Sequence, residues 1–303
     1  MKILLQFPQG LKQYALAEAG KYEKEGHEIF LSSSPCWGAC DLAIDEAKKI
    51  GAQKLIHYGH SKFQETNEKE INIEYKLFPI DANLQALKNS LPKLKNYKKL
   101  ALVTTVSHIH QLNEMKKILT DAGHEIFTEK GALASMEGQV LGCDAYAASK
   151  LADKVDAIIY FGGGKFHPLG IDVKKPILAV NPYAKGSEFI NEHLEKKRKK
   201  EKGMLIAASQ AKTIGIILST KTGQFNLKIA ENAKKKLKEL GKNAQILVSN
   251  EIDFISLKDF NIFDAYITTA CPRLIDDTER IEKPVINISQ FPELLVLIGK
   301  TRV

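Results

Sequence analysis

The chain of 303 residues is 44% hydrophobic and 26% charged, a composition typical of a folded globular enzyme that excludes disordered, collagen-like and disulfide-stapled proteins. Its net charge of +8 comes from 44 Lys and Arg against 36 Asp and Glu. No aromatic-and-basic motif or recognition helix accompanies this charge, so we expect a solvated surface and no direct nucleic-acid partner. The sequence has no apolar run of about 18 residues and no signal-peptide pattern at its start, so we expect a cytoplasmic protein without a membrane partner.

The same order of elements repeats three times along the chain. Each unit opens with a short apolar run typical of a buried parallel strand. These runs are residues 2–8, 100–105 and 213–218. A helix of about four turns is expected next, ending before a glycine suited to the left-handed position that follows a helix. These helices are residues 11–24, 109–122 and 227–240, and the glycines are Gly26, Gly123 and Gly241.

A second strand, a second helix and two further strands complete each unit. The expected second strands are residues 26–30, 123–127 and 241–247, and the second helices are 42–50, 145–154 and 252–260. The third strands are residues 54–58, 157–161 and 265–269, and the last strands are 75–80, 176–181 and 284–289. Strands that alternate with helices predict right-handed crossovers and a parallel sheet.

We therefore predict an α/β fold of three similar lobes, each a small, mostly parallel sheet flanked by helices, arranged around a pseudo-threefold centre. The predicted lobes are residues 1–95, 96–188 and 189–303, and a long helix over about 188–202 should lead into the third.

Three of the four cysteines fall where such sheets bind ligands, beyond the carboxyl ends of the strands. Cys40 and Cys143 precede the second helix of the first two units, and Cys271 follows the third strand of the third unit. Each lobe thus contributes one thiol, and the three are expected to converge. Three thiolates suit either a zinc ion with one open position or a [4Fe–4S] cluster with one open iron. Cys36 has no counterpart in the other units and is expected to pack in the core, with a fourth ligand as the alternative.

Several motifs resemble those of the archaeal enzymes that catalyse the first step of diphthamide synthesis. The motifs occur in the same order along essentially the whole chain, and they include His-Tyr-Gly-His at 57–60 and Gln-Val-Leu-Gly-Cys at 139–143. The matching segments are residues 38–41, 56–61, 138–143, 221–224 and 270–277. Trp37 stands where the family usually has tyrosine, a tolerable substitution.

The resemblance implies a specific activity and cofactor. Family members hold a [4Fe–4S] cluster through three cysteines, which match Cys40, Cys143 and Cys271 here. They transfer the 3-amino-3-carboxypropyl group of S-adenosylmethionine to imidazole C2 of a histidine in translation elongation factor 2, by noncanonical radical chemistry. The resemblance also implies that the protein forms a homodimer, and the radical chemistry implies an electron donor that reduces the cluster.

Four further residues are expected to bind S-adenosylmethionine. Arg273 would bind its carboxylate, with an ordinary surface ion pair as the alternative. Gln224 would bind the same moiety, with a helix-start role as the alternative. Gly163, in a run of three glycines, would let the backbone approach the ligand, unless the run is only a turn. His60 aligns with Cys271 and, like His57, would line the site or act in proton removal, unless it is a structural strand-end residue.

Two other functions fit the same cysteines. One is a conventional transferase with a three-cysteine zinc site, and the other is an iron–sulfur sensor or assembly scaffold without enzymatic activity. A nucleotide-binding module is a weaker alternative, because no strand is followed by the full phosphate-loop spacing.

Overall fold

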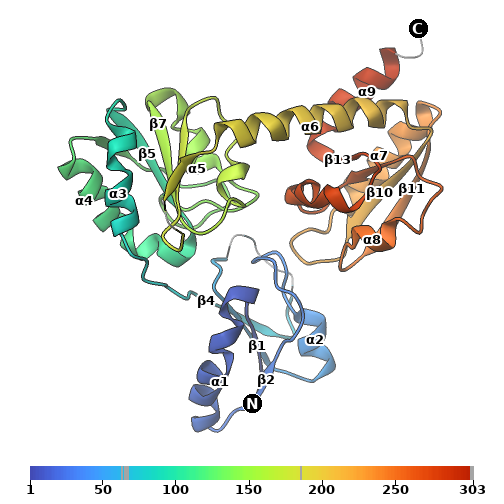
Figure 1. The fold of residues 1–303 in the computed structure, drawn as a ribbon. Helices are drawn as coiled ribbons and strands as arrows, with labels where there is room; N and C mark the ends of the chain where they lie inside the picture. The colour runs from blue at the N-terminus through green and yellow to red at the C-terminus, as the bar shows by residue number, and fades with distance from the viewer. Residues whose placement is uncertain (63, 65–67, 185, 301–303) are drawn as a thin grey trace. The chain divides into compact units, whose positions relative to one another are not determined.

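The computed structural model describes residues 1–62, 64, 68–184 and 186–300, and it contains three sheets with one repeated topology (Figure 1). The first sheet has the order β2-β1-β3-β4 and is entirely parallel. Its strands are β1 (Lys2–Gln6), β2 (Glu28–Leu31), β3 (Lys54–Tyr58) and β4 (Asn72–Lys76). The predicted α/β class, with three mostly parallel sheets flanked by helices, is confirmed.

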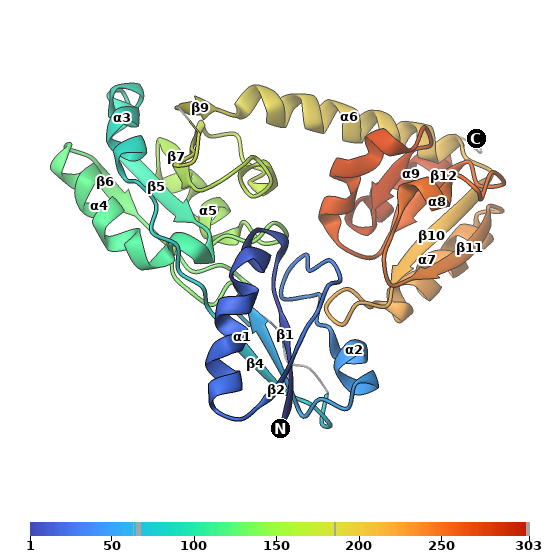
Figure 2. The same cartoon turned by 60° about the horizontal axis from the view of Figure 1, so that its bottom comes forward.

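The second and third sheets repeat this order. The second is β6-β5-β7-β8-β9, in which only β9 is antiparallel, and the third is β11-β10-β12-β13 (Figure 2). The strands of the second sheet are β5 (Lys99–Thr104), β6 (Glu125–Phe127), β7 (Ala157–Phe161), β8 (Ile177–Val180) and β9 (Ser187–Phe189). Those of the third are β10 (Thr213–Ser219), β11 (Asn243–Ser249), β12 (Ala265–Thr268) and β13 (Val285–Asn287).

The strand register confirms the repeat at the level of single residues. In each sheet the first strand pairs with the third in the same way, through Ile3 and Lys54, Leu100 and Ala157, and Ile214 and Ala265. Counting on from these pairs makes His60, Gly163 and Cys271 equivalent positions, each just beyond its third strand. In such an open sheet the ligand side lies where the strand order reverses, which here is between the first and third strands.

Alternating side chains of each first strand build two cores per sheet. In β1, Leu5 packs with α1 (Ala15–Lys24), whereas Leu4 packs with α2 (Ile44–Lys49) on the opposite face (Figure 1). Successive strand residues point to opposite faces, so a strand covered on both sides must be apolar throughout. The same division recurs in β5 and β10, which explains the continuous apolar runs in the sequence.

The first helix of each unit ends as predicted but does not always begin as predicted. Gly26, Gly123 and Gly241 all have the positive φ expected after a helix, at 83°, 91° and 65°. In the first two units a 3-10 turn replaces the first helical turns, at η1 (Gln9–Tyr14) and η2 (Val106–Gln111), before α1 and α4 (Leu112–Asp121). In the third unit α7 (Leu227–Glu239) matches its predicted range closely.

The second helices are shorter than expected, and the last strand of the first unit lies earlier than expected. The observed helices are α2, α5 (Tyr146–Ser149) and α8 (Phe254–Leu257), with a 3-10 turn η3 (Ala152–Lys154) after α5. Strand β4 covers residues 72–76 rather than 75–80. Pro79 has no N–H for a sheet ladder, and Ile80 N donates instead to Ser107 O in the second sheet's η2 turn.

Two helices and one strand were not predicted: α3 (Gln85–Leu94), α9 (Phe291–Lys300) and β9. Leu87 and Leu94 of α3 are fully buried and pack in the same core as Leu100 and Leu102 of the second sheet. This packing favours a lobe boundary between β4 and α3, earlier than the predicted one at residue 95. The three-lobe division itself stays a prediction, and the contacts divide the chain into two compact units, Met1–Leu194 and Glu195–Val303.

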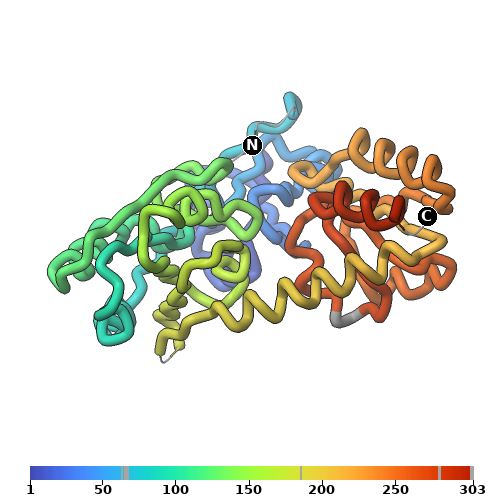
Figure 3. The backbone as a smooth tube through the Cα atoms, turned by 90° about the horizontal axis from the view of Figure 1, so that it is seen from above, coloured from blue at the N-terminus to red at the C-terminus, as the bar shows by residue number. Residues whose placement is uncertain are grey.

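The predicted long helix is present as α6 (Asn191–Gln210), which begins and ends later than the expected range of 188–202 because residues 187–189 form β9, and its unbroken coil is visible in Figure 3. Its Leu194 packs in the core of the second sheet, and its Leu205 and Ala208 pack in the core of the third. Short 3-10 turns complete the fold at η4 (Pro168–Gly170), η5 (Pro272–Arg280) and η6 (Ile288–Gln290). Among the described residues, none of the helices combines the length and apolar character that crossing a bilayer requires.

The packing of α3 predicts a large stability effect at Leu87. Leu87→Ala should lower the free energy of unfolding by about 2–5 kcal/mol, because it removes a fully buried side chain and leaves a cavity. Denaturant unfolding followed by circular dichroism would measure this. Leu16→Ala on α1, where the side chain is 79% exposed, is the matched control and should change stability by less than about 0.5 kcal/mol. Equal effects at the two positions would contradict the assignment of α3 to this core.

Candidate functional site

A buried glutamine at the end of β1 fastens the loop that carries Cys40. Gln6 Nε2 donates to Asp41 O at 2.7 Å, and Ala43 N donates to Gln6 Oε1 at 3.1 Å. These bonds hold the residues directly after Cys40 against the carboxyl end of the strand. Gln6 is 2% exposed, so both ends of its amide are satisfied within the protein rather than by solvent. Cys40 itself is partly exposed and does not form a disulfide.

The hydrogen bonds of Gln6 also determine which ring nitrogen carries the proton in two neighbouring histidines. Because Oε1 already accepts from Ala43 N, His57 Nδ1, which lies 2.8 Å away, must be the donor in its bond with Gln6. In neutral His57 the Nε2 atom then has a lone pair, and it accepts from His60 Nδ1 at 2.9 Å. Burial lowers the pKa of His57 to about 3, with a further contribution from His60, and burial lowers the pKa of His60 to about 4. Both rings are therefore neutral at neutral pH.

The turn between the two histidines depends on glycine. Gly59 has a φ of 77°, and a Cβ there would lie 2.6 Å from a methyl carbon of Leu11. Only glycine adopts this conformation without strain and leaves room for Leu11. The His-Tyr-Gly-His motif thus places two imidazoles together at the edge of the sheet.

Cys36 lies in the Cys40 loop but in a different environment. It is 6% exposed, and its Sγ and one ring nitrogen each of His57 and His60 lie within 4.8 Å of one another. Burial, with a smaller contribution from Asp41, raises the pKa of Cys36 to about 12. The prediction that Cys36 is buried agrees with the structure, and its histidine neighbours are a feature that the sequence did not reveal.

In the second sheet, Asp144 organises the loop around Cys143. Its Oδ2 accepts from Leu133 N at 2.6 Å and Ala134 N at 2.9 Å, and its Oδ1 accepts from Tyr146 N at 3.0 Å. Burial alone would raise the pKa of Asp144, but these backbone N–H bonds outweigh it and hold the pKa below its usual value. The carboxylate therefore stays ionised and fixes the backbone on both sides of Cys143, whose side chain is exposed.

A second buried glutamine joins the first two sheets at this edge. Gln139, four residues before Cys143, is fully buried, and its Nε2 donates to Ser61 Oγ at 2.8 Å, next to His60. Its Oε1 accepts from Met136 N at 3.2 Å. The loops that carry His60 and Cys143 are thus connected by a direct side-chain bond.

In the third sheet, Gln224 holds Cys271. Cys271 N donates to Gln224 Oε1 at 3.2 Å, and Gln224 N donates to Lys221 O at 2.9 Å within the turn that follows β10. Lys221 is anchored in turn by an ion pair with Glu251 at 2.6 Å. Gln224 is 8% exposed and lies three residues before α7. A buried glutamine therefore braces a cysteine loop in each of the three sheets.

Arg273 forms an ion pair within the protein. The whole residue is 6% exposed, and its Nε donates to Asp276 Oδ2 at 2.6 Å while Nη2 contacts the same oxygen. Lys197 also pairs with Asp276, at 3.0 Å. The sequence left a surface ion pair as the alternative. The ion pair is present, but its arginine is buried, and contact between Arg273 and a ligand stays a prediction.

Gly163 follows β7 and lies beside two tyrosine side chains. Its carbonyl oxygen accepts from Tyr160 Oη at 3.3 Å, and a Cβ at this position would lie 3.3 Å from the Tyr183 ring. A larger side chain would press against that ring. The close approach of backbone to ligand that we expect here remains a prediction.

The predicted site residues all lie at the carboxyl-end edges of their sheets, as the sequence indicated. Cys40, Cys143, His60 and Gly163 belong to the first compact unit, and the second holds Cys271, Gln224 and Arg273. Gln6, Gln139 and Asp144 were missed. Gln6 could have been identified from the sequence, because it is a polar residue at the ligand-side end of an otherwise apolar strand.

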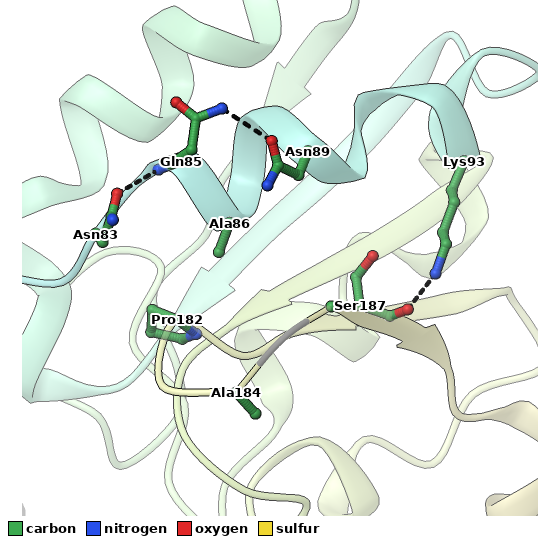
Figure 4. A pocket seen from close by; sticks show the side chains of 9 residues that line it. Asn83, Gln85, Ala86, Asn89, Lys93, Pro182, Ala184 and Ser187 are labelled. Atoms are coloured by element: carbon green, nitrogen blue, oxygen red, sulfur yellow. Dashed lines mark hydrogen bonds between the residues drawn. The ribbon is translucent and has the colours of Figure 1, made fainter.

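A separate cavity in the first unit contains none of the predicted site residues (Figure 4). Its volume is about 460 Å³, and it lies between α3 and the segment that connects β8 to β9. The residues that line it are Asn83, Gln85, Ala86, Asn89, Lys93, Pro182, Ala184, Gly186 and Ser187.

The family model and the related sequences that this chain resembles point to the same family. The sequence model of the diphthamide synthesis protein family matches residues 7–302. A protein of Pyrococcus horikoshii named 2-(3-amino-3-carboxypropyl)histidine synthase is 36% identical over 98% of this chain and 86% of its own length. A protein of the same name from Methanocaldococcus jannaschii is 31% identical over 96% of this chain and 83% of its own length.

A solved structure matches the whole fold. The crystal structure of Dph2 from Pyrococcus horikoshii with a 4Fe-4S cluster superposes with a TM-score of 0.87 and 36% sequence identity. The match covers 98% of this chain and 86% of that chain.

Proposed function

Because the chain belongs to the diphthamide synthesis protein family, we propose that it is a 2-(3-amino-3-carboxypropyl)histidine synthase. In this proposal it transfers the 3-amino-3-carboxypropyl group of S-adenosylmethionine to imidazole C2 of a histidine in translation elongation factor 2. The observation that carries the proposal is the matching relative, 36% identical over 98% of the chain, whose crystal structure contains a 4Fe-4S cluster.

The cysteines fit a cluster of this kind. Cys40, Cys143 and Cys271 do not form disulfides and have partly or fully exposed side chains, one at the ligand-side edge of each sheet. Three thiolates from separate chain segments satisfy three irons and leave one open to a substrate. We propose these three residues as the cluster ligands. When bound, the cluster supplies the one-electron reduction of S-adenosylmethionine that a poor nucleophile such as imidazole C2 requires.

The surrounding residues hold the ligands and the substrate. Gln224 keeps Cys271 in place through the backbone bond described above, and it borders the proposed S-adenosylmethionine site. Arg273 would present a guanidinium, oriented by Asp276, to the carboxylate of the methionine moiety. Gly163 and His60 would line the same site from the first unit. Which carbon–sulfur bond breaks depends on how these contacts orient the sulfonium.

The proposal includes three partners and a location. Translation elongation factor 2 is the protein substrate, a second copy of the chain forms a homodimer, and a separate electron donor reduces the cluster. The cytoplasm contains the substrate, and its reducing conditions keep the cysteines available as ligands. The resemblance of the motifs to the archaeal enzymes supports the protein substrate and the homodimer, and the electron that the reaction requires supports the donor.

Anaerobic incubation with S-adenosylmethionine and elongation factor 2 tests the proposed activity. We expect the reduced protein to add one 3-amino-3-carboxypropyl group to a single histidine, detected by mass spectrometry of the digested factor, and to release methylthioadenosine. Cys143→Ala is the matched control and should give neither product. An iron–sulfur sensor would contain iron and sulfide without forming methylthioadenosine, and a zinc transferase would contain no sulfide. Either result would overturn the proposal.

A further inference from the structure

Three side chains of the Cys40 loop and the end of β3 form a group in which only His60 has a role in the proposed reaction, at the edge of the S-adenosylmethionine site. Cys36 Sγ and one ring nitrogen each of His57 and His60 lie within 4.8 Å of one another. Thiolate and neutral imidazole are the ligands that zinc prefers in proteins, and they commonly bind it from distant chain segments. We propose that Cys36, His57 and His60 form a second metal site, which binds a zinc ion separately from the iron–sulfur cluster.

The hydrogen bonds around His57 prepare it as a ligand. Gln6 Oε1 accepts the Nδ1 proton of His57, which leaves the Nε2 lone pair directed toward His60. A partner that accepts the proton of the non-ligating nitrogen fixes the tautomer and the ring orientation of a metal-bound histidine. Gln6 is itself held by Ala43 N and Asp41 O, so the ring cannot turn freely.

The distances require only a small adjustment. Zinc bonds of about 2.0–2.3 Å place tetrahedral ligand atoms about 3.3–3.7 Å apart. The largest separation here, up to 4.8 Å, must therefore shorten by about 1 Å. The 2.9 Å contact between the two imidazoles must open slightly, and the ion then replaces their mutual hydrogen bond.

The negative charge of Asp41 favours a cation at this position. Burial, with a smaller contribution from Asp41, raises the pKa of the Cys36 thiol, and a bound cation would reverse this effect because it stabilises the thiolate. Both histidines are already neutral, as metal binding requires, so only the thiol must lose a proton to solvent, while the His60 proton moves from Nδ1 to Nε2 and frees the Nδ1 lone pair for the ion. The thiolate and Asp41 together then offset the two positive charges of zinc. Three protein ligands leave one position for water or another ligand.

The location suggests what the ion does. Cys36 lies on the same loop as Cys40, whereas His57 lies in β3 and His60 in the turn that follows it. A zinc ion would therefore fasten the Cys40 loop to the sheet at a point distinct from the bonds of Gln6. We expect zinc to slow thermal unfolding of the first unit without being required for iron binding.

Metal analysis of two variants separates the zinc site from the cluster. The cluster-loaded protein is treated with a chelator, then equilibrated with zinc under anaerobic conditions, and zinc and iron are measured for each chain. Cys36→Val should weaken zinc binding by more than about 100-fold while keeping iron, because even the loss of a partner that only orients a ligand costs about 10–100-fold. Cys40→Ala should lose iron and keep zinc.

Further variants and a spectroscopic probe keep the result interpretable. Ser33→Ala, on the same loop with an exposed side chain, should bind zinc like the parent protein. Cobalt in place of zinc should give a thiolate-to-cobalt absorption band that His60→Asn weakens and Cys36→Val abolishes. The proposal of a second metal site would be overturned if Cys36→Val bound zinc as tightly as the parent protein. It would also be overturned if Cys40→Ala lost its zinc. If both variants kept their iron, the result would instead count against the proposed cluster ligands.

Discussion

Replacing Cys40, Cys143 or Cys271 by alanine is expected to abolish retention of the iron–sulfur cluster. These three thiols are the proposed protein ligands, so each substitution leaves two ligands for a cluster that normally needs at least three. Iron and acid-labile sulfide, measured in each anaerobically purified variant after gel filtration, should fall to background. Each variant should still fold, because none of the three side chains is buried in a core.

Cys36→Ala is the matched control for this series. It removes a thiol from the same loop as Cys40, but the thiol faces His57 and His60. We expect this variant to retain iron and sulfide at the level of the parent protein. A Cys271→Ala protein that keeps a full cluster would contradict a shared site formed from all three sheets, because Cys271 is the third sheet's proposed ligand.

Gln6→Ala is expected to destabilise the first sheet and release the Cys40 loop. The substitution leaves three buried groups without their partner: Asp41 O, Ala43 N and His57 Nδ1. Each unsatisfied group costs about 1–3 kcal/mol, so the free energy of unfolding should fall by on the order of 3 kcal/mol. The cluster should also be lost faster when the purified protein is exposed to a chelator.

Two further variants test whether Gln6 acts by positioning the Cys40 loop or only by being polar. Gln13→Ala removes an exposed amide that donates to Gly10 O, so stability should change by less than about 0.5 kcal/mol. Gln6→Glu keeps an acceptor for Ala43 N and His57 Nδ1 but loses the donor to Asp41 O, so it should lie between the parent and Gln6→Ala. If iron were released at the same rate from Gln6→Ala and the parent, Gln6 would not position the Cys40 loop.

The strands and their ligand-side loops could be predicted from the sequence because the signal is local. Continuous apolar runs mark strands that are covered on both faces, and the observed first and third strands match the predicted ones to within two residues. Once the strands are placed, parallel topology puts Cys40, Cys143 and Cys271 at carboxyl-end edges without further information.

Other features depend on contacts between distant residues and could not be predicted in this way. Helix α3 contains Pro92, which argues against a helix, and its place beside the second sheet is decided by the burial of Leu87. The contact of Cys36 with His57 joins a loop to a strand end, and the bond from Gln139 to Ser61 spans 78 positions. No periodicity in a single segment reports such pairs.

The most direct test of the central claim, that three cysteines hold a cluster with one open iron, is Mössbauer spectroscopy of the anaerobic protein before and after addition of S-adenosylmethionine. We predict that the signal of one iron changes on addition, while the irons bound by Cys40, Cys143 and Cys271 keep theirs. A spectrum that S-adenosylmethionine leaves unchanged, or one that shows only isolated iron ions, would contradict the claim.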